Sequence, residues 1–340
     1  MRISAQPARQ AARAFVGLGR RGAASTAGTE EHLPLVFLRH GQSTWNKQNI
    51  FIGMTDTPLT EEGLEEARGA GALLRGHPQY SGFDGAHTSL LRRSTATMWT
   101  VLSELGLEWL PVTKSFALNE RSYGALVGKN KKECVDKFGK DQVKLWRRSW
   151  DTPPPPMDRD HQFWPFKEPR YAKLGIKEED IPLSESLKDV TKRTSKYWDE
   201  TIRPQLLAGK RLLIVGHENN LRSILKRLDN ISDDDILQIE LPRAVPLVYH
   251  LDRKTLRPIP LPQPAPGLSG RYLMNPQQLA QIAVRDHALV YGEHAKTLPV
   301  PSFTHREKKV AESTARLSMH HNIKSYSMMK QQNSSSSSLF

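Results

Sequence analysis

The stretch Pro34-Leu35-Val36-Phe37-Leu38-Arg39-His40-Gly41 joins a short apolar run directly to a polar tripeptide. An apolar run without polar alternation predicts a strand buried on both faces, as in a parallel sheet. A second run, Leu212 to Val215, leads into Gly216-His217 in the same way. In open α/β sheets, ligands bind in the crevice beyond the carboxyl ends of the strands. We therefore expect His40 and His217 to face one crevice.

Segments with helical periodicity alternate with these apolar runs. Thr60 is the predicted cap of a helix whose first turn, Glu61 and Glu62, suits the positive end of the helix dipole. A short strand is expected near Phe83 to Thr88, and Ser89 is expected to cap the next helix. Further helices are expected over residues 131–138, 141–150, 187–207, 219–228 and 276–291, and a strand over 245–251. The alternation predicts a three-layer α/β fold with a mostly parallel central sheet flanked by helices.

Three segments lack a regular pattern. Residues 41–57 are rich in Gly, Asn and Thr, and we expect a loop over the end of the first strand. Residues 116–128 form a second polar loop. Residues 153–182 begin with the run Pro153–Pro156 and contain many aromatic residues, which predicts an irregular Pro-rich insert. A loop of this length inside a compact domain is usually functional.

The net charge of +13 lies mostly at the two ends of the 340-residue chain. Residues 1–29 carry five arginines and no acid, and residues 299–340 carry six Lys or Arg against two Glu. The rest carries only +4, so we do not expect nucleic-acid binding. No apolar run approaches the roughly 18 residues that span a bilayer, so we expect no membrane segment. The single cysteine, Cys134, excludes an internal disulfide.

The two ends predict different kinds of segment. Residues 1–29 are rich in Arg and Ala and lack a long apolar core, which is typical of a transit peptide. We expect mitochondrial import, with a plastid or a basic arm on a cytoplasmic protein as the alternatives. Residues 299–340 end in a Ser-rich run, and we expect a disordered basic tail.

The residues around His40 suit chemistry on a phosphate. A neutral imidazole is a good nucleophile near pH 7, since its reference pKa is about 6.5. Arg39 can bind phosphate oxygens through its guanidinium fork, and Gly41 lets the backbone approach a ligand closely. His217 can donate to phosphoryl oxygens as charge moves. The chain has no His-Glu-x-x-His run and no Cys pair, and we expect no metal.

Three other polar stretches complete the candidate site. Arg92-Arg93 opens a helix after a short strand, and a helix N-terminus with an arginine suits an anion. One of these arginines must face outward, and the sequence alone does not decide which. Glu120 could move a proton to and from an oxygen, although a surface salt bridge is its ordinary role. Trp146-Arg147-Arg148 could bind a second anion or form an exposed helix face.

The motifs together resemble the cofactor-dependent phosphoglycerate mutases of the histidine phosphatase superfamily. The resemblance covers roughly residues 33–296, and we expect a mutase-like catalytic domain over residues 33–298. It rests on Arg39 to Lys47, Leu59 to Gly63, Leu118 to Leu126, Asn130-Lys131, Trp146 to Arg148, Pro153 to Asp158, Pro169 to Ala172 and Glu185 to Asp189. The glutamate loop and the Pro-rich insert distinguish mutases from smaller phosphatases of the superfamily.

The resemblance implies a role for each matching residue. His40 would become phosphohistidine, Glu120 would give and take the proton, and Arg39, Arg93 and His217 would surround the transferred group. Substrate binding would involve Ser43, Asn46, Ile52, Gly53, Arg121, Tyr123, Lys131, Arg147, Arg148 and Asn219. The family interconverts 3-phosphoglycerate and 2-phosphoglycerate, is primed by 2,3-bisphosphoglycerate and needs no metal. Its small-molecule substrate is the expected partner, and dimers or tetramers are common.

Several positions depart from the family pattern. Ile52 stands where a small hydroxyl residue is usual, Ser122 replaces a common histidine, and Arg243-Ala244 replaces a Thr-Gly pair. Glu218 follows the second histidine where glycine is usual. A carboxylate about 4 Å from a phosphate charge would cost roughly 4 kcal/mol at an effective dielectric of about 20. The alternatives are therefore a bisphosphoglycerate phosphatase or synthase, or a catalytically impaired paralogue that binds phosphometabolites.

Overall fold

The computed structural model describes residues 32–291. The predicted transit peptide, residues 1–29, and the predicted tail, residues 299–340, lie outside the described residues. The last residues of the expected catalytic domain, 292–298, lie outside them as well.

One sheet runs through the described part of the chain. Its seven strands lie in the order β3-β2-β4-β1-β5-β6, and β7 pairs with β5. The strands are β1 (His32–Arg39), β2 (Gly85–Thr88), β3 (Val112–Lys114), β4 (Leu212–Gly216), β5 (Leu247–Asp252), β6 (Pro258–Ile259) and β7 (Arg271–Tyr272). Strands β1 to β4 are parallel, whereas β5 is antiparallel to β1, β6 and β7. The predicted α/β fold with a mostly parallel sheet is confirmed, and β3, β6 and β7 are additions to the predicted strands.

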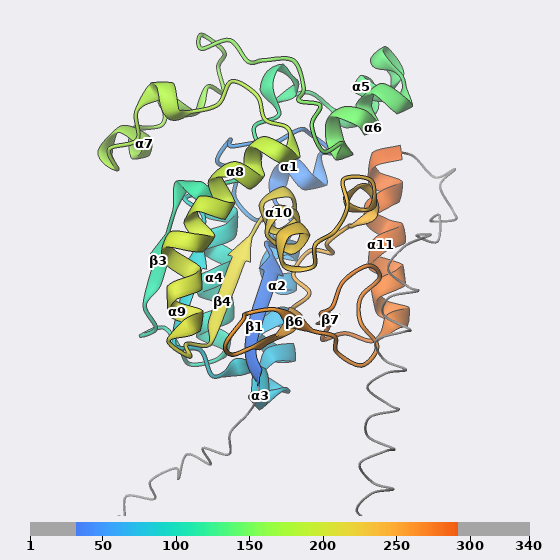
Figure 1. Cartoon of the computed structure of the whole chain (residues 1–340). Helices are drawn as coiled ribbons and strands as arrows, with labels where there is room; N and C mark the ends of the chain where they lie inside the picture. The colour runs from blue at the N-terminus through green and yellow to red at the C-terminus, as the bar shows by residue number, and fades with distance from the viewer. Residues whose placement is uncertain (1–31, 292–340) are drawn as a thin grey trace, which may run out of the picture. The chain divides into compact units, whose positions relative to one another are not determined.

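Helices cover both faces of the sheet (Figure 1). Leu35 and Phe37 point to the face that packs against α8 (Leu187–Tyr197), α9 (Arg203–Leu207) and α10 (Glu218–Leu228). Val36 and Leu38 point to the opposite face, where α2 (Glu61–Arg75) and α4 (Arg92–Glu104) pack. Alternate residues of one strand therefore build two cores, as the period of two dictates.

The Pro-rich insert and its neighbouring helices lie beyond the carboxyl ends of β1 and β4 (Figure 1). This region contains α5 (Lys131–Phe138), α6 (Lys140–Arg148) and α7 (Pro169–Lys173). Asn130 caps α5 by accepting from the N–H groups of Lys132 and Glu133. The predicted helix over residues 131–138 is confirmed. The insert is less irregular than expected, because α7 starts at Pro169, where a proline suits the first turn.

Other helix predictions need correction in detail. The predicted helix over 187–207 contains a π-helical turn, Trp198–Ile202, shortly before Pro204, which has no N–H for the helical ladder. The expected loop over 41–57 contains a short helix, α1 (Thr44–Lys47). Ser89 does not cap α4, because Leu91 occupies the N-cap position. The remaining helices are α3 (Pro78–Ser81) and α11 (Pro276–Tyr291), which confirms the last predicted helix.

The pairing of β1 with β4 determines where the two histidines lie. Arg39 is the register partner of Gly216, so that His40 and His217 follow at the same level of the sheet. The His40 N–H donates to the carbonyl oxygen of Gly216 at 3.0 Å. No helix among residues 32–291 is long and apolar enough to cross a membrane.

The loop after His40 lies directly on the first turn of α2, and glycine makes this approach possible. A Cβ atom on Gly63 would lie 2.0 Å from the carbonyl oxygen of Gln42, and one on Gly41 would lie 2.2 Å from that of Gly63. We predict that Gly63→Ala lowers the free energy of unfolding by about 1–3 kcal/mol, because backbone must move to make room. Denaturant titration measures this change.

Gly69 provides the matched control on the same helix. A Cβ atom there meets nothing within 4 Å, so Gly69→Ala should raise the free energy of unfolding by up to about 1 kcal/mol. Equal stability of Gly63→Ala and Gly69→Ala would contradict the close packing of the loop on α2.

Candidate active site

The two predicted histidines lie side by side. Their ring centroids are 4.9 Å apart and the rings are inclined by 63°. Both side chains are buried. The expectation that the residues after these two strands lie together is therefore confirmed for this pair, and a shared ligand crevice stays a prediction.

The hydrogen bonds of His40 determine which ring nitrogen can react. Its Nδ1 lies 2.7 Å from the carbonyl oxygen of Gly41, which can only accept, so Nδ1 carries the proton. The Arg93 Nε–H donates to Nε2 at 3.3 Å. Burial, Arg93 and Arg39 hold the pKa of His40 well below its usual value, against the opposite effect of the Gly41 hydrogen bond. His40 is therefore a neutral imidazole with its lone pair on Nε2, the form that a nucleophile requires.

Arg93 is held beside His40 by backbone oxygens. Its guanidinium donates to the carbonyl oxygens of Thr55 and Gly53 at 2.8 and 2.9 Å. Burial lowers the pKa of Arg93 to about 10, and Glu120 and Asp56 act in the opposite direction. The group therefore keeps its charge near neutral pH. Arg92 is exposed on the same helix, which confirms Arg93 as the inward-facing arginine.

His217 contacts Ser89, which the sequence analysis predicted to be a helix cap. Its Nε2 lies 2.8 Å from Ser89 Oγ, which already accepts from the N–H of Leu91. The serine hydroxyl can therefore donate to Nε2, and the proton of His217 then sits on Nδ1. Among residues 32–291, Nδ1 has no hydrogen-bond partner although it is buried. An N–H in this position suits an anionic oxygen of a ligand.

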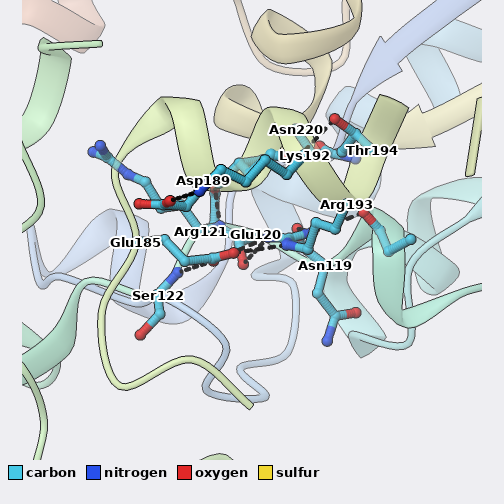
Figure 2. Close-up of polar contacts among 12 residues, drawn as sticks. Asn119, Glu120, Arg121, Ser122, Glu185, Asp189, Lys192, Arg193, Thr194 and Asn220 are labelled. Carbon is cyan, nitrogen blue, oxygen red and sulfur yellow. Dashed lines mark hydrogen bonds and ion pairs between the residues drawn. The ribbon is translucent and has the colours of Figure 1, made fainter. Parts of the chain in front are cut away.

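Glu120 lies in a loop that α8 holds in place. Its Oε1 accepts from the N–H of Arg121 at 2.7 Å, and the side chain is buried. Arg193 of α8 donates to the carbonyl oxygens of Ala117, Asn119 and Glu120 at 2.7, 3.0 and 3.3 Å. Figure 2 shows this guanidinium among the loop residues. The sequence did not indicate Arg193, because it lies more than 70 residues from the loop.

Glu185 holds the same loop from its other end. Its carboxylate accepts from the Ser122 N–H at 2.8 Å and from Arg193 Nε at 2.8 Å (Figure 2). Glu185 begins the Glu185 to Asp189 stretch that resembles the mutases, and this was the sequence signal that could have indicated it. Arg193 and Glu185 together therefore position the backbone that carries Glu120.

A second group of cations lies near the first, as the sequence suggested. The side chains of Arg121, Arg147 and Arg148 are buried, which contradicts the alternative of an exposed helix face for Arg147 and Arg148. The Arg121 guanidinium lies 4.5 Å from the Tyr123 ring centroid and donates to the carbonyl oxygen of Arg147 at 2.8 Å. Asn219 donates to the Tyr123 hydroxyl at 3.3 Å.

Arg222 belongs to this second group although the sequence did not indicate it. It lies one turn after Glu218 on α10, is fully buried, and donates to Asn219 Oδ1 at 3.0 Å. Burial and Arg148 lower the pKa of Arg222 to about 9, against the opposite effect of Glu218. The i,i+4 spacing from Glu218 was the available signal.

Glu218 pairs with cations instead of standing alone near the site. Its carboxylate lies 2.5 Å from Arg148 Nη1 and 3.2 Å from Arg39 Nη2. Burial would raise the pKa of Glu218, but Arg148, Arg39 and Arg222 hold it well below its usual range. The carboxylate is therefore ionised and paired, which removes the uncompensated repulsion expected from the sequence.

The remaining predicted substrate residues have structural partners. Ser43 and Asn46 form the capping box of α1. Ile52 and Gly53 are buried, and Gly53 has a φ of 56°, which glycine adopts without strain. Lys131 lies 5.9 Å above the Phe51 ring. Contact of these residues with a substrate stays a prediction. No group of three or more His, Cys, Asp or Glu that could hold a metal occurs among residues 32–291.

Comparison with known proteins agrees with this geometry. Residues 35–165 match the model of the histidine phosphatase superfamily (branch 1).

Similar solved structures include a putative alpha-ribazole-5'-P phosphatase from Escherichia coli, at 21% identity and a TM-score of 0.48. The match covers 67% of this chain and 95% of that chain. A mycobacterial glucosyl-3-phosphoglycerate phosphatase in complex with VO3 matches at 20% identity and a TM-score of 0.49. This second match covers 64% of this chain and 92% of that chain.

The titration of Lys131 provides a test of whether this residue binds a ligand. Burial, Arg147, Arg39 and Arg148 lower the pKa of Lys131 to about 7, with Glu218 acting in the opposite direction. The ammonium is charged below this pKa and neutral above it. We predict that the KM for an anionic phosphate ester rises roughly three- to tenfold between pH 6 and pH 8.5. Steady-state kinetics across this range measure the change.

Lys131→Arg is the control, because its guanidinium keeps its charge over the whole range. The KM of this variant should change only through titration of the ester itself, whose second pKa is near 6. A parallel pH dependence in both proteins would exclude Lys131 as its source.

Arg193 should affect the proton transfer more than substrate binding. In Arg193→Gln the Glu120 loop loses three backbone contacts, and a misplacement of about 1 Å can cost 10²-fold in rate. We predict a kcat about 10²-fold lower for an alkyl phosphate, whose leaving oxygen needs a proton. Cleavage of p-nitrophenyl phosphate, whose leaving group needs little protonation, should fall much less. Comparison of the two rates tests this role.

The neighbouring Lys192 is the matched control. It pairs with Asp189 at the surface of the same helix, so Lys192→Gln should keep both rates. Equal losses on both substrates in Arg193→Gln would show a general structural effect instead of a defect at Glu120.

Proposed function

We propose that this protein interconverts 3-phosphoglycerate and 2-phosphoglycerate through a phosphohistidine at His40. The observation that supports this most strongly is the neutral His40 beside Arg93 and His217, with a second cationic group nearby. A phosphoglycerate carries a phosphate and a carboxylate, so it offers one anion to each cationic group. The motifs of the glutamate loop and the insert point to the same reaction.

The protein's residues divide the work of the transfer. His40 Nε2 attacks phosphorus, so that a P–N bond forms as the P–O bond to the leaving oxygen breaks. Arg93 and the Nδ1–H of His217 stabilise the charge on the equatorial oxygens. Glu120 gives a proton to the leaving oxygen and takes one from the accepting hydroxyl in the reverse step. The Nδ1–H bond to Gly41 keeps the imidazole oriented throughout.

The proposed cofactor, 2,3-bisphosphoglycerate, fits the charges of the site. When bound, it supplies the first phosphoryl group of the cycle. Arg39 and Arg93 would hold one of its phosphates, and Arg121, Arg147 and Lys131 would hold the other anionic groups. The buried Arg121 Nε and Nη1 have no hydrogen-bond partner among residues 32–291, which suits such a role.

A phosphatase or bisphosphoglycerate-metabolising enzyme is the second candidate. Both reactions share the phosphohistidine and differ in whether water or a hydroxyl accepts the phosphoryl group. The pairing of Glu218 with Arg39 and Arg148 favours this candidate, because it reduces the positive charge that holds the accepting substrate. Release of phosphate without isomerisation would identify it.

We also propose import into the mitochondrion through residues 1–29, and assembly into dimers or tetramers. The first proposal rests on the arginine-rich, acid-free composition of that segment. The second rests on the resemblance to the mutases alone.

His40 should be the residue that accepts the phosphoryl group. We predict that protein incubated with 2,3-bisphosphoglycerate labelled in its phosphates becomes radioactive with the acid-labile, base-stable behaviour of phosphohistidine, and that His40→Ala does not. Conversion of 3-phosphoglycerate by the native chain, followed enzymatically, should depend on the bisphosphate and disappear in the same variant.

His77→Ala is the control, because this histidine lies at the start of α3 and its Nδ1 bonds the backbone oxygen of Leu73. It should be labelled like the native chain. Full conversion of 3-phosphoglycerate by His40→Ala would sink the mechanism, and absence of labelling in the native chain would favour the catalytically impaired reading.

A further inference from the structure

Glu218 lies between Arg39 and Arg148, which belong to different cationic groups of the site. Arg39 is the neighbour of the nucleophile His40, whereas Arg148 belongs to the second cationic group. The Glu218 carboxylate contacts both, at 3.2 and 2.5 Å. The side chains of all three residues are largely buried, with exposed fractions of 11–14%. A carboxylate therefore occupies the position between the two arginines that a ligand anion would require.

The other groups around the Glu218 carboxylate also favour negative charge. Glu218 is the first residue of α10 and so lies at the positive end of the helix dipole. Arg222 follows one turn later. The Glu218 charge acts to raise the pKa of both Arg222 and Lys131. One carboxylate thus lies near three arginines, Arg39, Arg148 and Arg222, and near Lys131, whose pKa of about 7 leaves it partly charged at neutral pH. This arrangement leaves an excess of positive charge, so that a ligand with a single anionic group is accommodated without moving Glu218.

The contacts of the two arginines outside Glu218 show what a larger ligand would meet. Arg39 Nη1 donates to the carbonyl oxygen of Leu241 at 2.6 Å, and Arg148 Nη2 pairs with Glu240 at 2.8 Å. These contacts involve one terminal nitrogen of each guanidinium. The other terminal nitrogens, Nη2 of Arg39 and Nη1 of Arg148, are those that Glu218 contacts. A second or third ligand anion would therefore compete with Glu218 for these nitrogens.

We propose that Glu218 is a specificity-determining residue that competes with the second anionic group of the substrate for Arg39 and Arg148. The inference rests on the proposed function only in taking His40 as the place where the first phosphate binds. Compared with a site that lacks this carboxylate, Glu218 weakens the binding of ligands with several anionic groups more than the binding of ligands with one. Doubly and triply anionic esters bind only as far as they displace Glu218, which weakens binding of a bisphosphate primer most.

Glu218→Gln tests the proposal, because it removes the charge and keeps the size of the side chain. Isothermal titration calorimetry measures binding of glycerol 3-phosphate, 3-phosphoglycerate and 2,3-bisphosphoglycerate, which carry one, two and three anionic groups. We expect affinity for 2,3-bisphosphoglycerate to rise by about tenfold or more, since release of one competing charge at close range is worth at least a factor of ten. Affinity for glycerol 3-phosphate should rise by less than about threefold, with 3-phosphoglycerate between them.

Glu240→Gln is the matched control. Glu240 also pairs with Arg148, but it is more exposed and has no contact with Arg39 that the structure shows. Its loss should change all three affinities by less than about twofold. Glu218→Gly also removes the carboxylate and should give the same graded gain in affinity. Thermal unfolding followed by circular dichroism checks that both Glu218 variants are folded, and if one variant is unfolded, the affinities of the other test the proposal.

The outcomes separate this proposal from the proposed function. An equal gain for all three ligands in Glu218→Gln would mean a general change in charge, and no gain would mean no competition; either overturns the role of Glu218. A graded gain supports it even if the native chain forms no phosphohistidine, because calorimetry does not require transfer. If His40 is labelled but the three affinities show no graded gain in Glu218→Gln, phosphoryl transfer to His40 is supported and the role of Glu218 in ligand selection is rejected.

Discussion

The parallel pairing of β1 with β4 is the constraint on which the site depends. The register joins Arg39 to Gly216, and the bond from the His40 N–H to the Gly216 carbonyl oxygen extends the pairing by one residue. Two residues separated by 177 positions in the chain are thereby held at one end of the sheet. A slip of one residue would turn the apolar side chains of β1 to the wrong faces and separate the histidines. The same pairing that builds the two cores therefore builds the reactive pair.

Charge balance around the histidines determines their chemical state. Burial and neighbouring arginines hold the pKa of both His40 and His217 well below the usual value, so that both rings are neutral. The same arginines hold the pKa of Glu218 low, so that its carboxylate stays ionised. One set of cations thus keeps His40 neutral and forms an internal ion pair with Glu218.

Local signals account for the elements that could be predicted from the sequence. The helix over residues 131–138 has the predicted bounds, and local residues define both of its ends, since Asn130 caps the start and Gly139 follows the last residue. The short helix α1 was missed because four residues are too few to show helical periodicity, and the Ser43–Asn46 capping box that starts it is a local polar contact. Strands β3, β6 and β7 were missed because two or three residues carry no periodicity, and their strand conformation comes from pairing with β2 or β5.

The sequence by itself determined that two histidines end two buried strands and that an arginine adjoins the first, and it predicted chemistry on a phosphate. These features are local, since each needs only an apolar run and the residues directly after it. Only the tertiary structure decided that Arg93 and not Arg92 faces inward, that Ser89 bonds His217 instead of capping α4, and that Glu218 pairs with Arg39 and Arg148. It also brought Arg193 to the Glu120 loop. The partners of these side chains come from helices and loops that are distant in the sequence. A short stretch of sequence therefore does not show which partner a long side chain will contact.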